Sequence, residues 1–179
     1  MFFFNNIHRR LSHVIRYNNT PKLQHENVAT HSFFVALYTM VVTDSLNLPD
    51  AEKLKAIRMA LVHDIEESFS GDIIYDVKRQ SPEFKEAVTM MNHAILGKTL
   101  QGLPEETAKL YDELWKEYNM RDSYSAQIVE FADDLSAAMF SSEEVKLGNT
   151  YFEEILGNIK KRISNSQFYH QMGKMLNLG

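Results

Sequence analysis

The chain has 179 residues, of which 44% are hydrophobic, and it contains no cysteine. This length and hydrophobic content suit one domain with a sizeable core. The net charge of -5 provides no basic surface for binding duplex nucleic acid. The absence of cysteine excludes disulfides, a thiolate nucleophile and cysteine-ligated zinc, so any metal ligands must be His, Asp or Glu.

Neither the first residues nor the longest apolar run has the features of a membrane or export signal. The opening MFFFNN is too short for a signal-peptide core and has no basic segment before it. The longest apolar run, FFVALYTMVV, has ten residues, whereas about 20 are needed to cross a bilayer. We therefore expect a soluble, cytoplasmic protein that does not bind membranes.

Apolar residues recur with the helical period along the chain, and no segment shows the sustained alternation of a half-buried strand. This pattern predicts an all-α protein of about seven or eight helices, in a single domain covering residues 1–179. Asn27, Ser81 and Thr150 are predicted N-caps, and NNTPKLQHE is predicted to be a loop. The expected helices cover about 4–16, 27–46, 49–71, 81–100, 104–119 and 122–144, a seventh begins at Thr150, and an eighth covers 166–177.

The segment VHDIEESFSGD, residues 62–72, places a histidine and four carboxylates directly after the apolar run MALV. A solvated helix end is the ordinary explanation for a single His-Asp pair. On a continuous helix, however, His63, Asp64 and Glu67 fall within an arc of roughly 100°. This arc lies away from the stripe formed by Leu54, Leu61 and Ile65. Because the preceding residues point in nearly every direction, this part of the helix is expected to be buried, and buried charges need partners.

Two other helices carry polar residues on apolar faces. His31 lies in the first turn of the second predicted helix, on the face expected to be its core stripe, which comprises Phe34, Val35, Tyr38 and Val42. In VEFADDLSAAMF two aspartates interrupt an apolar segment, and the helical period makes Asp133 the more buried of the two, with Asp134 turned away. Two imidazoles and two carboxylates from three helices would suit a divalent transition metal, which lowers the pKa of bound water.

The order and spacing of these residues resemble a known signature. His63-Asp64 follows His31 by 32 residues, and Asp133 lies a further 69 residues on. This H…HD…D arrangement resembles that of HD-domain metal-dependent phosphohydrolases, and it is most similar to the YfbR-type 5′-deoxyribonucleotidases. The matching segments are IRYNNTPKLQHENVATHS, HDIEESFSGDIIYDVK and EFADDLSAA, so the resemblance covers about residues 7–140.

The resemblance implies a compact helical HD-domain fold and a role for each matching residue. The implied ligands of a divalent ion (Co, Mn, Zn, Mg or Fe) are His31, His63, Asp64 and Asp133. Glu67 and Asp72 match the catalytic carboxylates, and Arg16 and Lys78 match basic positions near the phosphate. Tyr17 matches an aromatic position, often Trp in this family, that lies against the sugar. We also expect a homo-oligomer, dimer or higher.

The expected reaction is removal of phosphate from deoxyribonucleoside 5′-monophosphates by a metal-activated water. Glu67 and Asp72 would share acid and base roles, in an order left open. Arg16 and Lys78 are the two obvious cations near the motifs, which favours a monophosphate over a triphosphate. The alternatives are a deoxynucleoside triphosphate triphosphohydrolase, an iron oxygenase, for which no further histidine is suitably placed, and a non-catalytic module that binds nucleotides or a partner helix.

Overall fold

A computed structural model describes residue 3 and residues 8–73 and 81–172, and these residues form an all-α structure, as predicted. A short 3-10 helix, η2, precedes the α-helices. The elements are η2 (His8–His13), α1 (Val28–Ser45), α2 (Asp50–Val62), α3 (Glu67–Ser70), α5 (Pro82–Thr99), α6 (Glu105–Met120), α7 (Tyr124–Lys146), α8 (Tyr151–Asn165) and α9 (Tyr169–Met172). None of the helices in this described part is long and apolar enough to span a bilayer.

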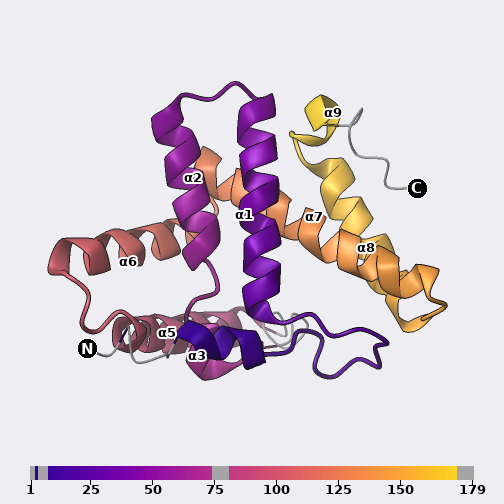
Figure 1. The fold of residues 1–179 in the computed structure, drawn as a ribbon, viewed down its shortest axis with the longest axis horizontal. Coiled ribbons are helices and arrows are strands. Elements are labelled where there is room, and N and C mark those ends of the chain that lie inside the picture. The colour runs from indigo at the N-terminus through magenta and orange to yellow at the C-terminus, as the bar shows by residue number, and fades with distance from the viewer. Residues whose placement is uncertain (1–2, 4–7, 74–80, 173–179) are drawn as a thin grey trace.

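Helix α7 is the central element of the arrangement. It packs against α1, α2, α6 and α8. In Figure 1, α1 and α2 stand side by side in front of α7, while α8 lies at its right-hand end and α3 and α5 lie at the foot of α1. The start of α1, the end of α2 and the middle of α7 therefore meet inside the molecule, which is where the sequence places its histidines and Asp133.

The expected helix over 49–71 is interrupted, which corrects the prediction of one continuous element. Helix α2 ends at Val62, residues 63–66 form turns, and α3 ends at Gly71, whose φ is 72°. The cause is visible at the break. The Nδ1 atom of His63 lies 2.7 Å from the carbonyl oxygen of Ala60, the acceptor that a continuing α-helix would use for residue 64. The chain continues with tighter bonds such as Ile65 N–H to Val62 O.

Three further local predictions need correction. The first helix is a 3-10 helix limited to His8–His13 in the described chain, because Val14 and Ile15 leave it to join the strand-like pairing of Ile15 with Asn27. The stripe predicted from Leu54, Leu61 and Ile65 is wrong for its first two members, which are 48% and 53% exposed, whereas Ile65 is buried. The small residues Ala56 and Ala60 are buried instead, in a helix that packs against α1, α6 and α7. On α1, Phe34 was likewise expected in the core and is 37% exposed.

The buried apolar residues form two clusters. One gathers side chains of α1, α2, α6 and α7 around Trp115 and Met59. The other gathers residues of α7, α8 and α9, including Phe131, Ile159 and Phe168. Helices α1 and α7 contribute to both clusters, and the ring of Tyr38 packs against both. These two long helices therefore form a rigid frame for the polar residues between them.

Candidate metal centre

Two buried histidines and an aspartate meet where α1, the end of α2 and α7 come together. Asn27 caps α1, since its side chain accepts the N–H of Thr30 at 2.9 Å, and this places His31 in the first turn. His63 and Asp64 follow the end of α2. One ligand atom each from His31, His63 and Asp64 lies within 4.8 Å of the others, which is compact enough to hold a metal ion.

Asp133 adjoins this group at His31. Its Oδ1 lies 3.0 Å from Nε2 of His31, and its Oδ2 accepts a hydrogen bond from the Tyr118 hydroxyl at 3.0 Å. The side chains of Asp133 and Asp134 are both only partly exposed, at 27% and 16%. Asp134 is shielded because Nε and Nη2 of Arg162 on α8 both donate to it. Asp133 borders the histidine group and keeps more exposure.

The histidine nitrogens fit a cation. Nε2 of His31 and Nε2 of His63 are buried and make no well-aligned hydrogen bond within the described residues. Each nevertheless lies 3.0 Å from a carboxylate oxygen, of Asp133 and Asp64 respectively. The contact between Nδ1 of His63 and the Ala60 carbonyl suits a proton on Nδ1, so Nε2 is the nitrogen that the neutral ring would offer to a metal. A divalent ion would satisfy all of these atoms together.

Two groups approach the other nitrogen of His31. Its Nδ1 lies 3.0 Å from Oγ of Ser136 on α7 and 2.8 Å from Nη1 of Arg16. Arginine can only donate, whereas a serine hydroxyl can accept. Ser136 is therefore the partner suited to His31 when Nε2 binds a metal and Nδ1 carries the proton.

The charges of the site act on one another through short distances. Burial alone would lower the pKa of His63, but the Asp64 carboxylate raises it to about 9. Burial and then the charge of Arg16 lower the pKa of His31. Burial opposes ionisation of Asp133, yet the adjacent His31 and then His63 hold its pKa below its usual range. The site thus favours an ionised Asp133 beside a neutral His31, the forms in which both bind metals.

The two carboxylates predicted to transfer protons lie at the two ends of the short helix α3. Glu67 is its first residue and is buried next to the His63-Asp64 turn. Asp72 follows Gly71 and is partly exposed. The backbone carbonyl of Asp72 accepts a hydrogen bond from Nδ2 of Asn18 at 3.1 Å, which joins the end of α3 to the loop that follows Tyr17.

The residues predicted to contact substrate are partly engaged with the protein. Nη1 of Arg16 lies 2.5 Å from a carboxylate oxygen of the buried Glu26. The ring of Tyr17 stacks on Phe140, with centroids 5.6 Å apart, and meets the edge of Phe152. Arg16 also contacts the candidate metal ligands, since its Nη1 lies 2.8 Å from Nδ1 of His31. Lys78, the second predicted cation, lies outside the described residues.

Several residues of the site were not found from the sequence. Glu26 pairs with Arg16, and Tyr118 binds Asp133, although neither belongs to a local pattern. Glu66 was expected to be a surface or structural residue. It is buried, and it accepts hydrogen bonds from Nε1 of Trp115 at 2.8 Å and Nδ2 of Asn92 at 3.4 Å. No pattern in the chain indicates these contacts, because each partner lies on another element.

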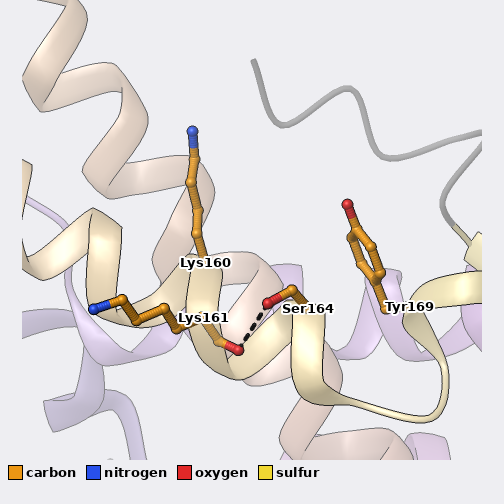
Figure 2. Close-up of a pocket in the computed structure, with 4 residues that line it drawn as sticks. All are labelled: Lys160, Lys161, Ser164 and Tyr169. Atoms are coloured by element: carbon orange, nitrogen blue, oxygen red, sulfur yellow. Dashed lines mark hydrogen bonds between the residues drawn. The ribbon is translucent and has the colours of Figure 1, made fainter.

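Two surface hollows occur away from this centre. One, of about 250 Å³ between α8 and α9, is lined by Lys160, Lys161, Ser164 and Tyr169. Figure 2 shows the two lysines pointing in different directions, with the Ser164 hydroxyl bonded to the Lys161 carbonyl. The other, of about 290 Å³, lies between α2 and α6. Neither hollow is lined by a residue of the histidine group, so neither provides the chemistry described above.

Comparison with known proteins assigns the chain to a family. A family model described as "5'-deoxynucleotidase YfbR-like" matches residues 2–174. The chain belongs to the YfbR-like family. The resemblance seen in the H…HD…D signature is thereby confirmed, and it extends to the C-terminal helices, where no motif had been matched.

Curated relatives of this YfbR-like chain come from mammals and bacteria. The chain is 31% identical over 135 residues to the 5'-deoxynucleotidase HDDC2 of Bos taurus, a match covering 74% of this chain and 60% of that protein. It is 28% identical over 158 residues to a 5'-deoxynucleotidase of Erwinia tasmaniensis, covering 87% and 79%. The chain thus spans about 60% of the length of the bovine relative and more of the bacterial one.

Solved structures show the same fold. An HD-domain phosphohydrolase from Listeria innocua superposes with a TM-score of 0.79 at 21% identity, covering 97% of this chain and 85% of that one. The cyanophage S-2L HD phosphohydrolase DatZ, bound to dA and one catalytic Zn²⁺, gives 0.68 at 19% identity, covering 96% and 92%. The expected HD-domain fold is therefore confirmed.

Proposed function

We propose that this YfbR-like chain is a metal-dependent phosphohydrolase that removes phosphate from deoxyribonucleoside 5′-monophosphates. The observation that carries the proposal is the buried group of His31, His63 and Asp64, whose imidazole Nε2 atoms make no well-aligned hydrogen bond among the described residues. The names of the curated relatives support the substrate class, since several are 5'-deoxynucleotidases. The dA bound by DatZ is consistent with a deoxynucleoside ligand on this fold.

In this proposal His31, His63, Asp64 and Asp133 hold one divalent ion, which is Co, Mn, Zn, Mg or Fe. When bound, such an ion supplies a water of lowered pKa. Ser136 and the Ala60 carbonyl orient the two imidazoles from their far sides. Tyr118 holds the second oxygen of Asp133, so that Oδ1 remains directed toward the histidine group.

Glu67 and Asp72 are proposed to transfer the protons. One takes a proton from the attacking water and the other gives a proton to the leaving 5′ oxygen, and their order is left open. The buried position of Glu67 at the start of α3 keeps it close to the His63-Asp64 turn. A partly exposed Asp72 can exchange protons with solvent between turnovers.

Substrate contacts are assigned to Arg16, Lys78 and Tyr17. Arg16 and Lys78 offset the phosphate charge, and Arg16 is held for this by Glu26. The ring of Tyr17 contacts the sugar, and we expect it to disfavour a 2′-hydroxyl less strictly than a larger Trp would. With only these two cations assigned, a monophosphate is favoured over a triphosphate.

The decisive experiment is a phosphate-release panel. The purified protein is incubated with nucleoside mono- and triphosphates, with Mg²⁺, Mn²⁺, Co²⁺ and Zn²⁺ tested separately. Inorganic phosphate plus nucleoside from dAMP, with little product from AMP, is the expected result. Intact triphosphate released from dATP at a higher kcat/KM would replace the proposal by a triphosphohydrolase. If no metal supports turnover, the proposal fails and the alternative of a non-catalytic module that binds nucleotides takes its place.

We also propose that residues 1–179 act as one domain in the cytoplasm and assemble into a homo-oligomer, dimer or higher. The supporting feature is a set of apolar side chains on one stretch of α1 that are 37–60% exposed, since large exposed apolar patches mark contact surfaces. They are Phe33, Phe34, Leu37, Met40 and Val41. Light scattering after size exclusion tests this assembly: Phe33→Glu should give a monomer, while Met90→Glu on α5 should leave the mass unchanged.

A further inference from the structure

The chain between Val14 and Val28 forms a loop whose two ends are joined. Ile15 pairs with Asn27, and Arg16 N–H donates to the Glu26 carbonyl at 3.0 Å. Figure 1 shows this segment leaving the foot of α1, running out toward the turn between α7 and α8, and returning. Arg16 and Tyr17, two of the proposed substrate contacts, lie on its outgoing arm. A contact from another element to the far end of the loop would therefore hold the whole loop in place.

Glu144, near the end of α7, holds this far end. Its side chain is 0% exposed. The carboxylate accepts the backbone N–H of Gln24 at 2.6 Å and that of Leu23 at 2.9 Å. It also accepts Nδ2 of Asn149 at 2.6 Å, and the same amide nitrogen donates to the Pro21 carbonyl at 3.0 Å. Three donors thus converge on one buried carboxylate, an arrangement that is costly unless every bond is made.

The bonds made by Glu144 are connected to Tyr17 through the loop. Lys22, between Pro21 and Leu23, donates from Nζ to the Tyr17 carbonyl at 2.8 Å. Tyr17 has a φ of 52°, a left-handed conformation that a residue with a side chain adopts only where its surroundings fix it. Its ring stacks on Phe140, which lies one turn before Glu144 on the same helix. Helix α7 therefore holds both the ring and the backbone of this part of the loop.

We propose that Glu144 is a positioning residue for substrate binding: it fixes the loop over residues 17–27 so that Arg16 and Tyr17 are held beside the metal centre. This rests on the proposed function, in which those two residues contact the nucleotide. Arg16 already lies 2.8 Å from Nδ1 of His31, so the loop reaches the edge of the centre. Within the described chain, the Glu144 carboxylate bonds loop atoms and Asn149, and it takes no part in the chemistry.

The test uses Glu144→Gln, which keeps the side-chain volume but turns one acceptor oxygen into an NH₂ group facing N–H donors. The matched control is Glu143→Gln, because Glu143 is the preceding residue and is exposed. The affinity for dAMP is measured by calorimetry on the full chain, together with KM, kcat, bound metal and the melting temperature. We expect Glu144→Gln to weaken dAMP binding and raise KM by tenfold or more, with kcat changed less than threefold and metal retained.

A lower melting temperature with unchanged Kd and KM would overturn the proposal, since it would make Glu144 a purely structural residue. If Glu144→Gln does not fold, Asn149→Ala removes the link between Glu144 and Pro21, and it must weaken dAMP binding in the same way. Failure of both variants to fold also counts against a positioning role. If the natural sequence binds dAMP but does not hydrolyse it, the proposed function fails. The comparison of Kd for dAMP between the natural sequence and Glu144→Gln still tests the positioning role of Glu144.

Discussion

The hydrogen bond from Tyr118 to Asp133 gives a quantitative test of the metal centre. Tyr118 lies on α6 and is buried, and its hydroxyl donates to Oδ2 of Asp133 at 3.0 Å. The other oxygen, Oδ1, lies 3.0 Å from Nε2 of His31. Replacing Tyr118 with Phe removes the donor while keeping the ring, which also packs edge-on to His63 at 5.2 Å. The carboxylate then loses the bond that fixes its orientation.

The size of the effect follows from the kind of bond removed. A hydrogen bond to a charged acceptor contributes about 1.5–3 kcal/mol, and every 1.4 kcal/mol corresponds to about tenfold in affinity. Because Asp133 retains its contact with His31, we expect the lower part of this range. Tyr118→Phe should therefore weaken metal binding by roughly 10- to 30-fold, within the roughly 10- to 100-fold effect usual for removing a partner of a metal ligand.

The assay is competition for Zn²⁺ or Mn²⁺ between the protein and a chromophoric chelator, with the melting temperature measured in parallel. Tyr111→Phe is the matched control, because Tyr111 lies on the same helix and packs against the same apolar cluster. The control should keep its metal affinity. Equal affinities for Tyr118→Phe and Tyr111→Phe would refute the reasoning that Asp133 is a ligand oriented by Tyr118.

Three further outcomes are expected. Asp133→Asn should lose bound metal, whereas Asp134→Asn should keep its metal and melt at a lower temperature because it weakens the pair with Arg162; elemental analysis showing equal loss would contradict this. Glu67→Ala should keep its metal and lower kcat by about 10²-fold or more, whereas Glu66→Ala should mainly lower the melting temperature, because Glu66 bonds Trp115; a larger loss of kcat for folded Glu66→Ala would reverse the assignment. In metal-free protein, the Asp64 carboxylate outweighs burial and raises the pKa of His63 from 6.5 to about 9, so its contribution to stability is complete below pH 6.5 and is lost as the pH rises through 9. The melting temperature in chelator should therefore fall between pH 7 and 9, and a flat profile would argue against the His63-Asp64 pair.

The sequence by itself determined most helices and pointed to the histidines and aspartates of the H…HD…D signature. Asn27, Ser81 and Thr150 were predicted as N-caps. The side chains of Asn27 and Ser81 each accept the backbone N–H of the third helical residue, whereas the Thr150 side chain makes no such bond. Such signals are local, because a cap bonds within its own first turn and an apolar period reflects one helix alone. The spacing of His31, His63-Asp64 and Asp133 likewise identified the family before any coordinates, since a signature is a property of chain order.

Contacts between elements were decided only by the tertiary structure. The helix breaks at His63 because the His63 side chain bonds the Ala60 carbonyl, the acceptor that the backbone of a continuing helix would use. The helical period of the sequence does not predict this bond. Leu54 and Leu61 are exposed, while the small residues Ala56 and Ala60 of the same helix are buried. Glu144 bonds the backbone of Leu23, 121 residues earlier in the chain. Such pairings depend on where whole helices pack, and packing is set by the summed burial of many side chains rather than by any local pattern.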